Sequence, residues 1–259
     1  MRLATWNVNS LKARLERVEE WLEQVQPDVL CVQETKLGPG VFPSMALASL
    51  GYEAADHGEG RWNGVAILSK VGIEDVQTGF GVGSPLDDEA RLVSAVCGGI
   101  RVFSAYVPNG RSPEDDHYRY KLEWLEALRV HLDRSFSPAD PVVVAGDFNV
   151  APDDRDVYDP AAFEGATHVT APERDAVRAL EDWGMVDVFR QHHEPGGLFS
   201  WWDYRAGSFH KGKGMRIDLV LATPVVAERA TMSLIDRNAR KGKSPSDHAP
   251  VIVDLADLT

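Results

Sequence analysis

The chain has 259 residues, of which 44% are hydrophobic and 26% are charged. This composition is typical of a folded protein and excludes an intrinsically disordered chain, a collagen or a coiled coil. No apolar run reaches the ~18 residues that a membrane-spanning helix needs, and the first residues lack the apolar stretch of a signal peptide. We therefore expect a cytoplasmic protein that makes no membrane contact.

The net charge of −13 argues against a polyanionic partner, but the charge is unevenly distributed. Residues 205–243 contain nine basic and three acidic side chains, so the rest of the chain is strongly acidic. A basic surface on an acidic protein can contact phosphate groups. A solvated loop surface fits the charge pattern equally well.

Apolar runs rich in β-branched residues predict strands in eight places. They cover residues 2–7, 28–33, 64–69, 91–97, 100–107, 142–147, 216–221 and 250–255. A first helix is expected over residues 11–25, where apolar side chains recur at helical spacing behind Ser10, a favourable N-cap residue. A second helix is expected over about residues 113–132 and a third over about residues 172–183.

The predicted strands between residues 64 and 107 follow one another with only turn residues between them, such as Gly98 and Gly99. Short connections of this kind favour antiparallel pairing and disfavour a Rossmann fold or an eight-stranded βα barrel. Runs of strands combined with amphipathic helices predict an α+β sandwich, in which two sheets pack face to face and helices cover their outer faces. Because no Pro-, Gly- or Ser-rich linker divides the chain, we expect a single domain over residues 1–259.

Polar side chains stand at or near the ends of several predicted strands. They are Asn7, Glu34, Asp147 with Asn149 two positions on, Asp218, and the adjacent Asp247 and His248. Strand ends are rigid, so these side chains can be held in place while the edge of the sheets stays open to a substrate. Clustered carboxylates repel one another unless a cation compensates them. Oxygen ligands without Cys or paired His select Mg²⁺, with Mn²⁺ as the alternative, so the sequence predicts a metal-dependent reaction on a phosphate group.

Six short motifs, in this order, carry a family resemblance that spans essentially the whole chain. They are Trp6-Asn7-Val8-Asn9, Gln33-Glu34-Thr35-Lys36, Tyr106-Val107-Pro108-Asn109-Gly110, Gly146-Asp147-Phe148-Asn149, Arg216-Ile217-Asp218-Leu219 and Ser246-Asp247-His248-Ala249-Pro250. Each motif alone is weakly specific, but the set resembles the exonuclease III branch of the exonuclease–endonuclease–phosphatase superfamily.

The resemblance implies a four-layer αββα sandwich of two mixed, mostly antiparallel sheets. It also implies a Mg²⁺-dependent DNA-repair nuclease that hydrolyses phosphodiesters 5′ to abasic sites in duplex DNA. Further activities implied by the resemblance are a 3′→5′ exonuclease and a 3′-phosphatase or phosphodiesterase. The implied partner is double-stranded DNA with abasic or 3′-blocked ends, bound by a monomer.

Carried over to this chain, the resemblance assigns Glu34 as the principal metal ligand, with Asn7 and Asp247 near the ion. Asp147 would take a proton from the attacking water, and Asn149 would orient Asp147 or the phosphate. These roles answer a chemical need, because a charged diester repels hydroxide and catalysis must place a water in line with the bond that breaks.

The resemblance further implies that His248 hydrogen-bonds a phosphate oxygen while Asp218 holds its other ring nitrogen. Tyr106 would contact the same phosphate. Hydrogen-bond donors at the phosphoryl oxygens neutralise the charge that builds up there during the reaction.

Three residues, Trp201, Trp202 and Met215, resemble the apolar pocket that accepts a flipped baseless sugar in the abasic-endonuclease branch. Plain core packing is the alternative for the two tryptophans. Arg91, Lys121 and the basic residues at 237–243 are predicted phosphate contacts, with a solvated surface position as the alternative for all of them.

Two other functions fit parts of the pattern. Another superfamily phosphoesterase, such as a non-specific deoxyribonuclease, would cleave undamaged substrates, and the predicted apolar pocket argues against it. A non-catalytic regulator that binds RNA or protein would have lost active-site residues, whereas each expected catalytic position is filled in this sequence.

Overall fold

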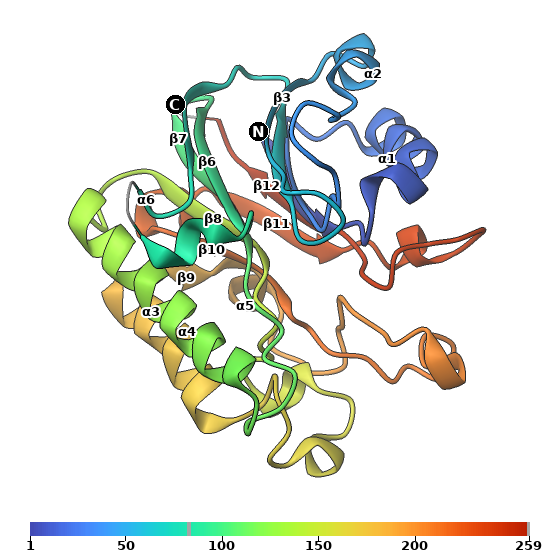
Figure 1. Ribbon diagram of the computed structural model, residues 1–259, viewed down its shortest axis with the longest axis vertical. Helices are drawn as coiled ribbons and strands as arrows, with labels where there is room; N and C mark the ends of the chain where they lie inside the picture. Colours follow the sequence, from blue (N-terminus) through green and yellow to red (C-terminus); the bar gives the residue numbers. More distant parts are fainter. Residues whose placement is uncertain (82–83, 258–259) are drawn as a thin grey trace.

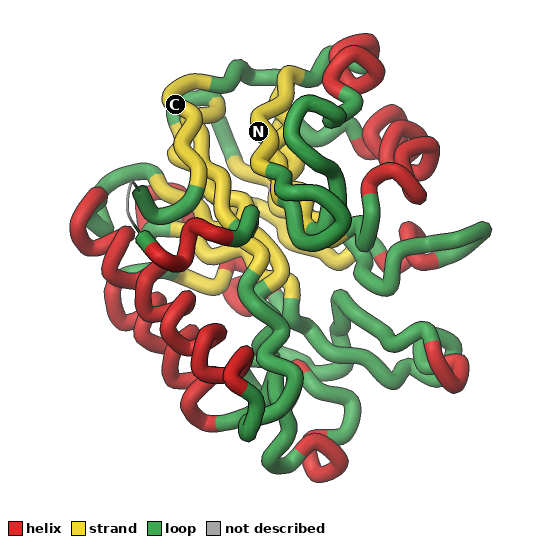
Figure 2. Tube along the Cα trace, viewed as in Figure 1, coloured by secondary structure: helices red, strands yellow, loops and turns green. Residues whose placement is uncertain are grey.

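The computed structural model describes residues 1–81 and 84–257, and it shows two β-sheets packed face to face with helices outside them (Figure 1). Each sheet has six strands. The fold is therefore the α+β sandwich of four layers that the sequence predicts. Figure 2 shows the strands in the middle of the molecule and several long loops gathered beyond one end of them.

The first sheet contains strands from both ends of the chain. Its order is β11 (Ala230–Ile235), β12 (Val251–Leu255), β1 (Arg2–Asn7), β2 (Val29–Gln33), β4 (Val65–Ser69) and β3 (Glu53–His57). β1 and β2 are parallel, and the other neighbours in this sheet are antiparallel.

The second sheet repeats this arrangement around its own parallel pair. Its order is β5 (Glu74–Thr78), β6 (Leu92–Cys97), β7 (Ile100–Tyr106), β8 (Val142–Asp147), β10 (Asp218–Ala222) and β9 (Val186–Asp187). β7 and β8 are parallel, and the other neighbours are antiparallel. A long helix connects the two strands of each parallel pair, because parallel neighbours need a crossover.

Helices cover the outer faces of both sheets. α1 (Leu11–Val25) and α2 (Ser44–Ser49) lie beside the first sheet, while α3 (Asp116–Ser135) and α4 (Ala171–Trp183) lie on the second (Figure 1). Two short helices are α5 (Val188–His192) and α6 (Pro224–Ala227), and 3₁₀ turns cover Pro85–Asp88, Asp154–Asp156, Pro160–Phe163, Arg205–Gly207 and Arg237–Arg240. The side chain of Ser10 caps α1, as predicted, by accepting a hydrogen bond from the backbone N–H of Ala13.

The core has three apolar layers. Leu3, Val29, Val102 and Val143 belong to the layer between the two sheets. One outer layer joins α1 to the first sheet and the other joins α3 and α4 to the second. Because the central strands are buried on both faces, they read in the sequence as continuous apolar runs rather than as alternating patterns.

All eight predicted strands are present, and four further strands were not expected. These four, β3, β5, β9 and β11, are the outermost strands of the two sheets. An outer strand has one neighbour and exposes more of its side chains, as in β5, where all five residues are exposed. No apolar run therefore marks these segments.

Two expectations about the elements are wrong in part. β6 and β7 pair antiparallel as predicted, but β4 lies in the other sheet, between β2 and β3. The second long helix begins at Asp116 rather than near residue 113, because Asp115 caps it by accepting a hydrogen bond from the backbone N–H of His117 at 2.8 Å.

Among residues 1–81 and 84–257, no helix is both long enough and apolar enough to cross a membrane. β1 and β12, from opposite ends of the sequence, pair directly with each other. A single domain over residues 1–259 stays a prediction.

Candidate active site

Strand register brings the predicted polar residues to one edge of the sandwich. Asn7 ends β1, and Glu34 directly follows β2, its parallel neighbour. In the second sheet, Asp147 pairs with Tyr106 of β7 and with Asp218 of β10. β1 and β8 contact each other across the interior, so the ends of the two sheets meet.

Glu34, Asp147 and His248 form the centre of the site, with possible metal-ligand atoms from all three within 4.8 Å of one another. Asn7 lies between the two carboxylates, and its Nδ2 donates to Oε1 of Glu34 and to Oδ2 of Asp147, both at 2.9 Å. Carboxylates this close repel each other unless a cation or a proton compensates them. Their oxygen atoms are the ligands that Mg²⁺ prefers, so the two carboxylates, rather than the imidazole, are suited to hold a divalent ion.

A chain of hydrogen bonds connects Asp247 to Glu34. The Asp247 carboxylate accepts from Nδ2 of Asn9 at 3.0 Å and from the indole N–H of Trp201 at 3.2 Å. Lys36 donates to Oδ1 of Asn9 at 2.6 Å, and its ammonium group lies 2.8 Å from Oε2 of Glu34. The sequence assigned no role to Asn9 or Lys36, although both stand in the motifs that carry the resemblance.

His248 lies between two carboxylates of the second sheet. Its Nδ1 is 2.9 Å from Oδ2 of Asp218, and its Nε2 is 3.7 Å from Oδ2 of Asp147. Burial by itself lowers the pKa of this imidazole, but the charges of Asp218 and Asp147 outweigh burial and raise the pKa to about 10. His248 is therefore a cation at neutral pH and can donate from Nε2 to an anionic oxygen.

Asp147 has the properties of a base that works near neutral pH. Burial raises its pKa to about 7, against the lowering effect of His248. Its Oδ1 accepts a hydrogen bond from the backbone N–H of Asn149 at 2.9 Å. The Asn149 side chain is fixed as well, because it donates to the carbonyl of Val107 at 3.0 Å and accepts from Asn109 at 3.2 Å. A carboxylate held in this way is suited to accept a proton from a water molecule.

Two buried serines support these groups. Oγ of Ser200 donates to Oδ2 of Asp218 at 2.6 Å. Oγ of Ser246 donates to the carbonyl of Asn7 at 2.7 Å and accepts from the backbone N–H of His248 at 3.2 Å. The sequence assigned no role to either serine. The local signal is the position of each hydroxyl side chain, since Ser200 stands among aromatic residues and Ser246 stands in the last motif.

Several residues around the site have a left-handed backbone conformation, which non-glycine residues seldom adopt. Glu34 has φ 52°, Lys36 has φ 53° and Asn149 has φ 51°. The Glu34 turn is held by its own carbonyl, which accepts from the backbone N–H of Ser10 at 2.7 Å. Uncommon conformations of this kind concentrate at functional sites, and hydrophobic periodicity does not reveal them.

Tyr106 ends β7 beside the carboxylates. Burial first, and then the charges of Glu34 and Asp147, raise the pKa of its phenol well above the usual value, so the hydroxyl stays protonated. The guanidinium group of Arg91 lies over its ring, 4.8 Å from the centroid. Arg91 is 6% exposed, and its predicted phosphate contact stays a prediction.

The structure separates the three residues predicted to line one apolar pocket. Trp201 and Met215 form an isolated β-bridge and pack in one small apolar cluster with Ile217. The indole N–H of Trp201 reaches Asp247, so this cluster adjoins the site. Trp202 packs in a different apolar cluster, with Phe199 and Ala249.

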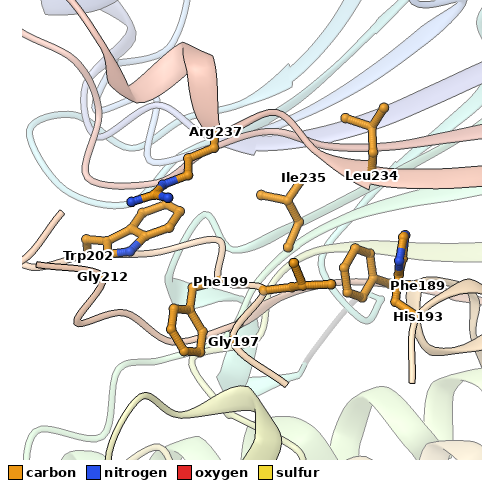
Figure 3. Close-up of a pocket in the computed structure, with 10 residues that line it drawn as sticks. Phe189, His193, Gly197, Phe199, Trp202, Gly212, Leu234, Ile235 and Arg237 are labelled. Carbon is orange, nitrogen blue, oxygen red and sulfur yellow. The ribbon is translucent and has the colours of Figure 1, made fainter. Parts of the chain in front are cut away.

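Trp202 instead lines a cavity of about 260 Å³, together with Phe199, Ile235 and Arg237 (Figure 3). The Arg237 guanidinium lies over the Trp202 ring, 5.6 Å from the centroid. Neighbouring residues of an extended segment point to opposite faces, which explains why Trp201 and Trp202 diverge.

Several predicted phosphate contacts lie inside the protein. Lys121 is fully buried in an ion pair with Glu173. Within the basic stretch 205–243, Arg216 is buried and pairs with Asp187 at 2.8 Å, and Arg240 is 6% exposed. The exposed positive charge of this stretch is therefore smaller than the sequence count suggests.

Comparison with known proteins decides the family. A sequence model of the Endonuclease/Exonuclease/phosphatase family matches residues 4–248. The chain belongs to this family. The match extends from β1 to His248, so it includes the residues that form the centre of the site.

Similar proteins include both curated and structurally solved members. Exodeoxyribonuclease III of Haemophilus influenzae is 31% identical, with an alignment that covers 97% of this chain and 98% of that protein. An AP endonuclease from Archaeoglobus fulgidus is 38% identical with a TM-score of 0.95, covering 98% of this chain and 99% of that one. The 3′ phosphatase NExo from Neisseria, solved with a product DNA hairpin, is 35% identical with a TM-score of 0.94 over 99% of both chains. The family and the fold expected from the motifs are confirmed.

Proposed function

We propose that this chain is a Mg²⁺-dependent DNA-repair nuclease that hydrolyses phosphodiesters 5′ to abasic sites in duplex DNA and also processes 3′ ends as an exonuclease and phosphatase. The observation that carries the proposal is the meeting of Glu34, Asp147 and the His248–Asp218 pair at one edge of the sandwich. A near-neutral base, a cationic donor and a cation-binding carboxylate are the groups that phosphate-ester hydrolysis requires.

In this proposal, the protein side chains divide the proton chemistry between them. Asp147 takes the proton of the attacking water, a role that contributes ~10²–10⁴ in rate when the base is well placed. His248 donates from Nε2 to a phosphoryl oxygen while Asp218 holds Nδ1. Tyr106, with its protonated hydroxyl, contacts the same phosphate, and Asn149 orients Asp147.

In this proposal Glu34 would be the principal residue that holds the metal ion, and Asn7 and Asp247 would help to hold it. The ion would contribute positive charge that offsets the negative charge of the phosphate during the reaction. Mn²⁺ has a similar preference for oxygen ligands and is the alternative ion.

The names of the relatives and the exposed lysines of two loops support DNA as the partner. Lys211 and Lys213 are exposed on one loop, and Lys241 and Lys243 are exposed on another. Lysines at phosphates release counterions and so bind DNA without reading its sequence. We further propose that the protein acts as a monomer, which light scattering checks, and its cytoplasmic location stays a prediction.

Trp201, which is partly exposed and donates to Asp247, is the residue best placed to receive a sugar without a base, and the buried Met215 packs against it. An apolar surface of this kind accepts a deoxyribose more readily than a full nucleotide. Trp202 does not take part in this version of the pocket, since it packs in another cluster.

One comparison favours a narrower second function. A Neisseria relative named as a 3′-5′ exonuclease is 36% identical with a TM-score of 0.94 and covers 98% of this chain. Under this alternative, the chain removes nucleotides or phosphates from 3′ ends and leaves internal abasic sites intact.

Three DNA substrates separate these functions: a duplex with one internal abasic site, a hairpin with a 3′-phosphate, and an undamaged circular duplex. Each is incubated with Mg²⁺, with Mn²⁺ and with EDTA, and Asp147→Asn serves as the inactive control. Cleavage of the first two substrates supports the main proposal, and cleavage at the 3′-phosphate alone supports the narrower one. Cutting of the circle indicates a non-specific nuclease, and no cutting with either ion contradicts every one of these activities.

A further inference from the structure

Arg91 directly precedes β6, and its side chain lies beside Tyr106, Tyr120 and Glu89. Its guanidinium is over the ring of Tyr106, 4.8 Å from the centroid, and over that of Tyr120 at 6.0 Å. The Glu89 carboxylate forms an ion pair with Arg91 and accepts the hydroxyl of Tyr120 at 3.2 Å. The positive charge of Arg91 is thus already balanced by the neighbouring Glu89 carboxylate.

The main chain ties Arg91 to Tyr106 as well. The carbonyl of Arg91 accepts the backbone N–H of Tyr106 at 2.8 Å. The guanidinium Nη1 donates back to the carbonyl of Tyr106 at 3.3 Å. Side chain and backbone together fix where β7 ends and how the Tyr106 ring is turned.

We propose that Arg91 is a positioning residue that holds the Tyr106 ring in the site, rather than a contact for a DNA phosphate. To reach a phosphate, the guanidinium would have to leave both Glu89 and the Tyr106 ring and move out from a site where it is 6% exposed. A planar guanidinium suits the bracing role because it can lie flat on a ring while its edge hydrogen-bonds a carboxylate and a carbonyl.

This inference rests on the proposed function, since the reaction in which Tyr106 acts is itself a proposal. The two are separable by the wild-type protein. If the wild type leaves all DNA substrates uncut, the proposed function fails. If the wild type cuts a substrate, the variants described below test the role of Arg91 alone.

The first measurement uses DNA binding without cleavage. Each variant is made in the Asp147→Asn background, and the dissociation constant for duplex DNA is measured over a range of salt concentrations. Loss of one phosphate contact lowers the slope of log K against log salt by about 0.9. We expect Arg91→Met to leave the slope unchanged, and a drop of about one would overturn the proposal.

The second measurement is turnover with an intact Asp147. We expect Arg91→Met to lower kcat about tenfold with KM for DNA unchanged. Arg91→Lys should lose a similar factor, because an ammonium group keeps the charge but cannot lie flat on the ring. Full activity in Arg91→Lys would contradict the bracing role.

A double-mutant cycle distinguishes the positioning role of Arg91 from a general structural defect. In the Tyr106→Phe background there is no hydroxyl to place, so Arg91→Met should change kcat by less than about twofold. An undiminished tenfold loss in that background would overturn the proposal. Arg178→Met is the matched control, because Arg178 is exposed on α4, and thermal melts of all variants report whether folding has changed.

Discussion

The strand ends and the surrounding loops of this molecule differ in how their polar groups are held. At the strand ends, Asn7, Asp147, Asp218 and His248 are buried, and each has hydrogen-bond partners from other elements. On the loops, basic side chains such as Lys241 and Lys243 are exposed. Under the proposed function, the strand ends perform the chemistry and the loops bind DNA.

This division follows from the rigidity of each region. A strand end is fixed by the ladder of hydrogen bonds behind it, so it can keep a base and a donor in place within a fraction of an ångström. An exposed loop lysine binds through charge, which acts over a distance and tolerates movement. Substitutions in the two regions should therefore change different quantities: kcat at the strand ends and the salt dependence of binding on the loops.

The largest effect is expected for Asp147→Asn. An amide cannot take the proton of water, so kcat should fall at least ~10²-fold. Duplex DNA should bind no more weakly than to the wild type, as a gel-shift titration checks. Near-normal turnover would remove Asp147 from the mechanism and break the assignment of chemistry to the strand ends.

Asp218→Asn should lower kcat by about 10- to 100-fold and change the pH dependence. With Asp218 present, the pKa of His248 is about 10, so the imidazolium persists through the neutral range and is lost only as pH rises toward that value. Without the Asp218 charge, burial pulls the pKa down, and the alkaline limb of the kcat profile should move to lower pH.

Ser200→Ala is the control for this substitution, because it removes a hydrogen bond to Asp218 but keeps the carboxylate. It should have only a few-fold effect on kcat. An alkaline limb that stays in the same place in Asp218→Asn would show that His248 is not the group that titrates.

Trp201→Ala tests a residue that links the site to the DNA-binding surface. Trp201 donates a hydrogen bond to Asp247, and it is also part of the predicted sugar pocket. Abasic-site cleavage should fall about tenfold, and removal of a 3′-phosphate should fall less, since apolar contact with the baseless sugar is lost. Trp202→Phe is the matched control and should lower stability by about 1–2 kcal/mol without changing substrate preference. Equal losses on both substrates in Trp201→Ala would reject the pocket.

The smallest effect on turnover is expected for the double substitution Lys241→Ala with Lys243→Ala. If both lysines contact phosphates, the slope of log K against log salt should fall by about two, while kcat at saturating DNA stays unchanged. Lys70→Ala is the control, because Lys70 is exposed just after β4, at the end of the first sheet away from Glu34. A lower kcat with an unchanged salt slope would erase the contrast between loops and strand ends.

Much of the architecture could be predicted from the sequence because local patterns encode it. The central strands are buried on both faces and read as apolar runs, and Ser10 marks the start of α1. The outermost strands escaped prediction because they lack a continuous apolar run, as in the fully exposed β5, and owe their conformation to a neighbouring strand.

Sequence patterns also fail to predict the roles of some single residues in the site. Asp147 and His248 were recognisable from their motifs, but the supporting roles of Ser200 and of Ser246, which begins the last motif, were not. Trp201 and Trp202 look alike in the sequence, yet they pack in separate clusters. Arg91 was predicted to contact a phosphate, and only the structure shows that its side chain pairs with Glu89 and lies over the Tyr106 ring.

The amino-acid sequence by itself determined the strand and helix segments of the core, the polar residues at the strand ends and, through six motifs, the family. Only the tertiary structure decided which polar residues are supported by Ser200 and Ser246, which tryptophan adjoins the site, and which cations are buried. The physical reason is that burial of a segment shows in the apolar pattern of its own residues, which is periodic in the helices and continuous in the central strands. A contact between distant segments depends on sheet register and on how the loops close, and no short stretch of sequence records either.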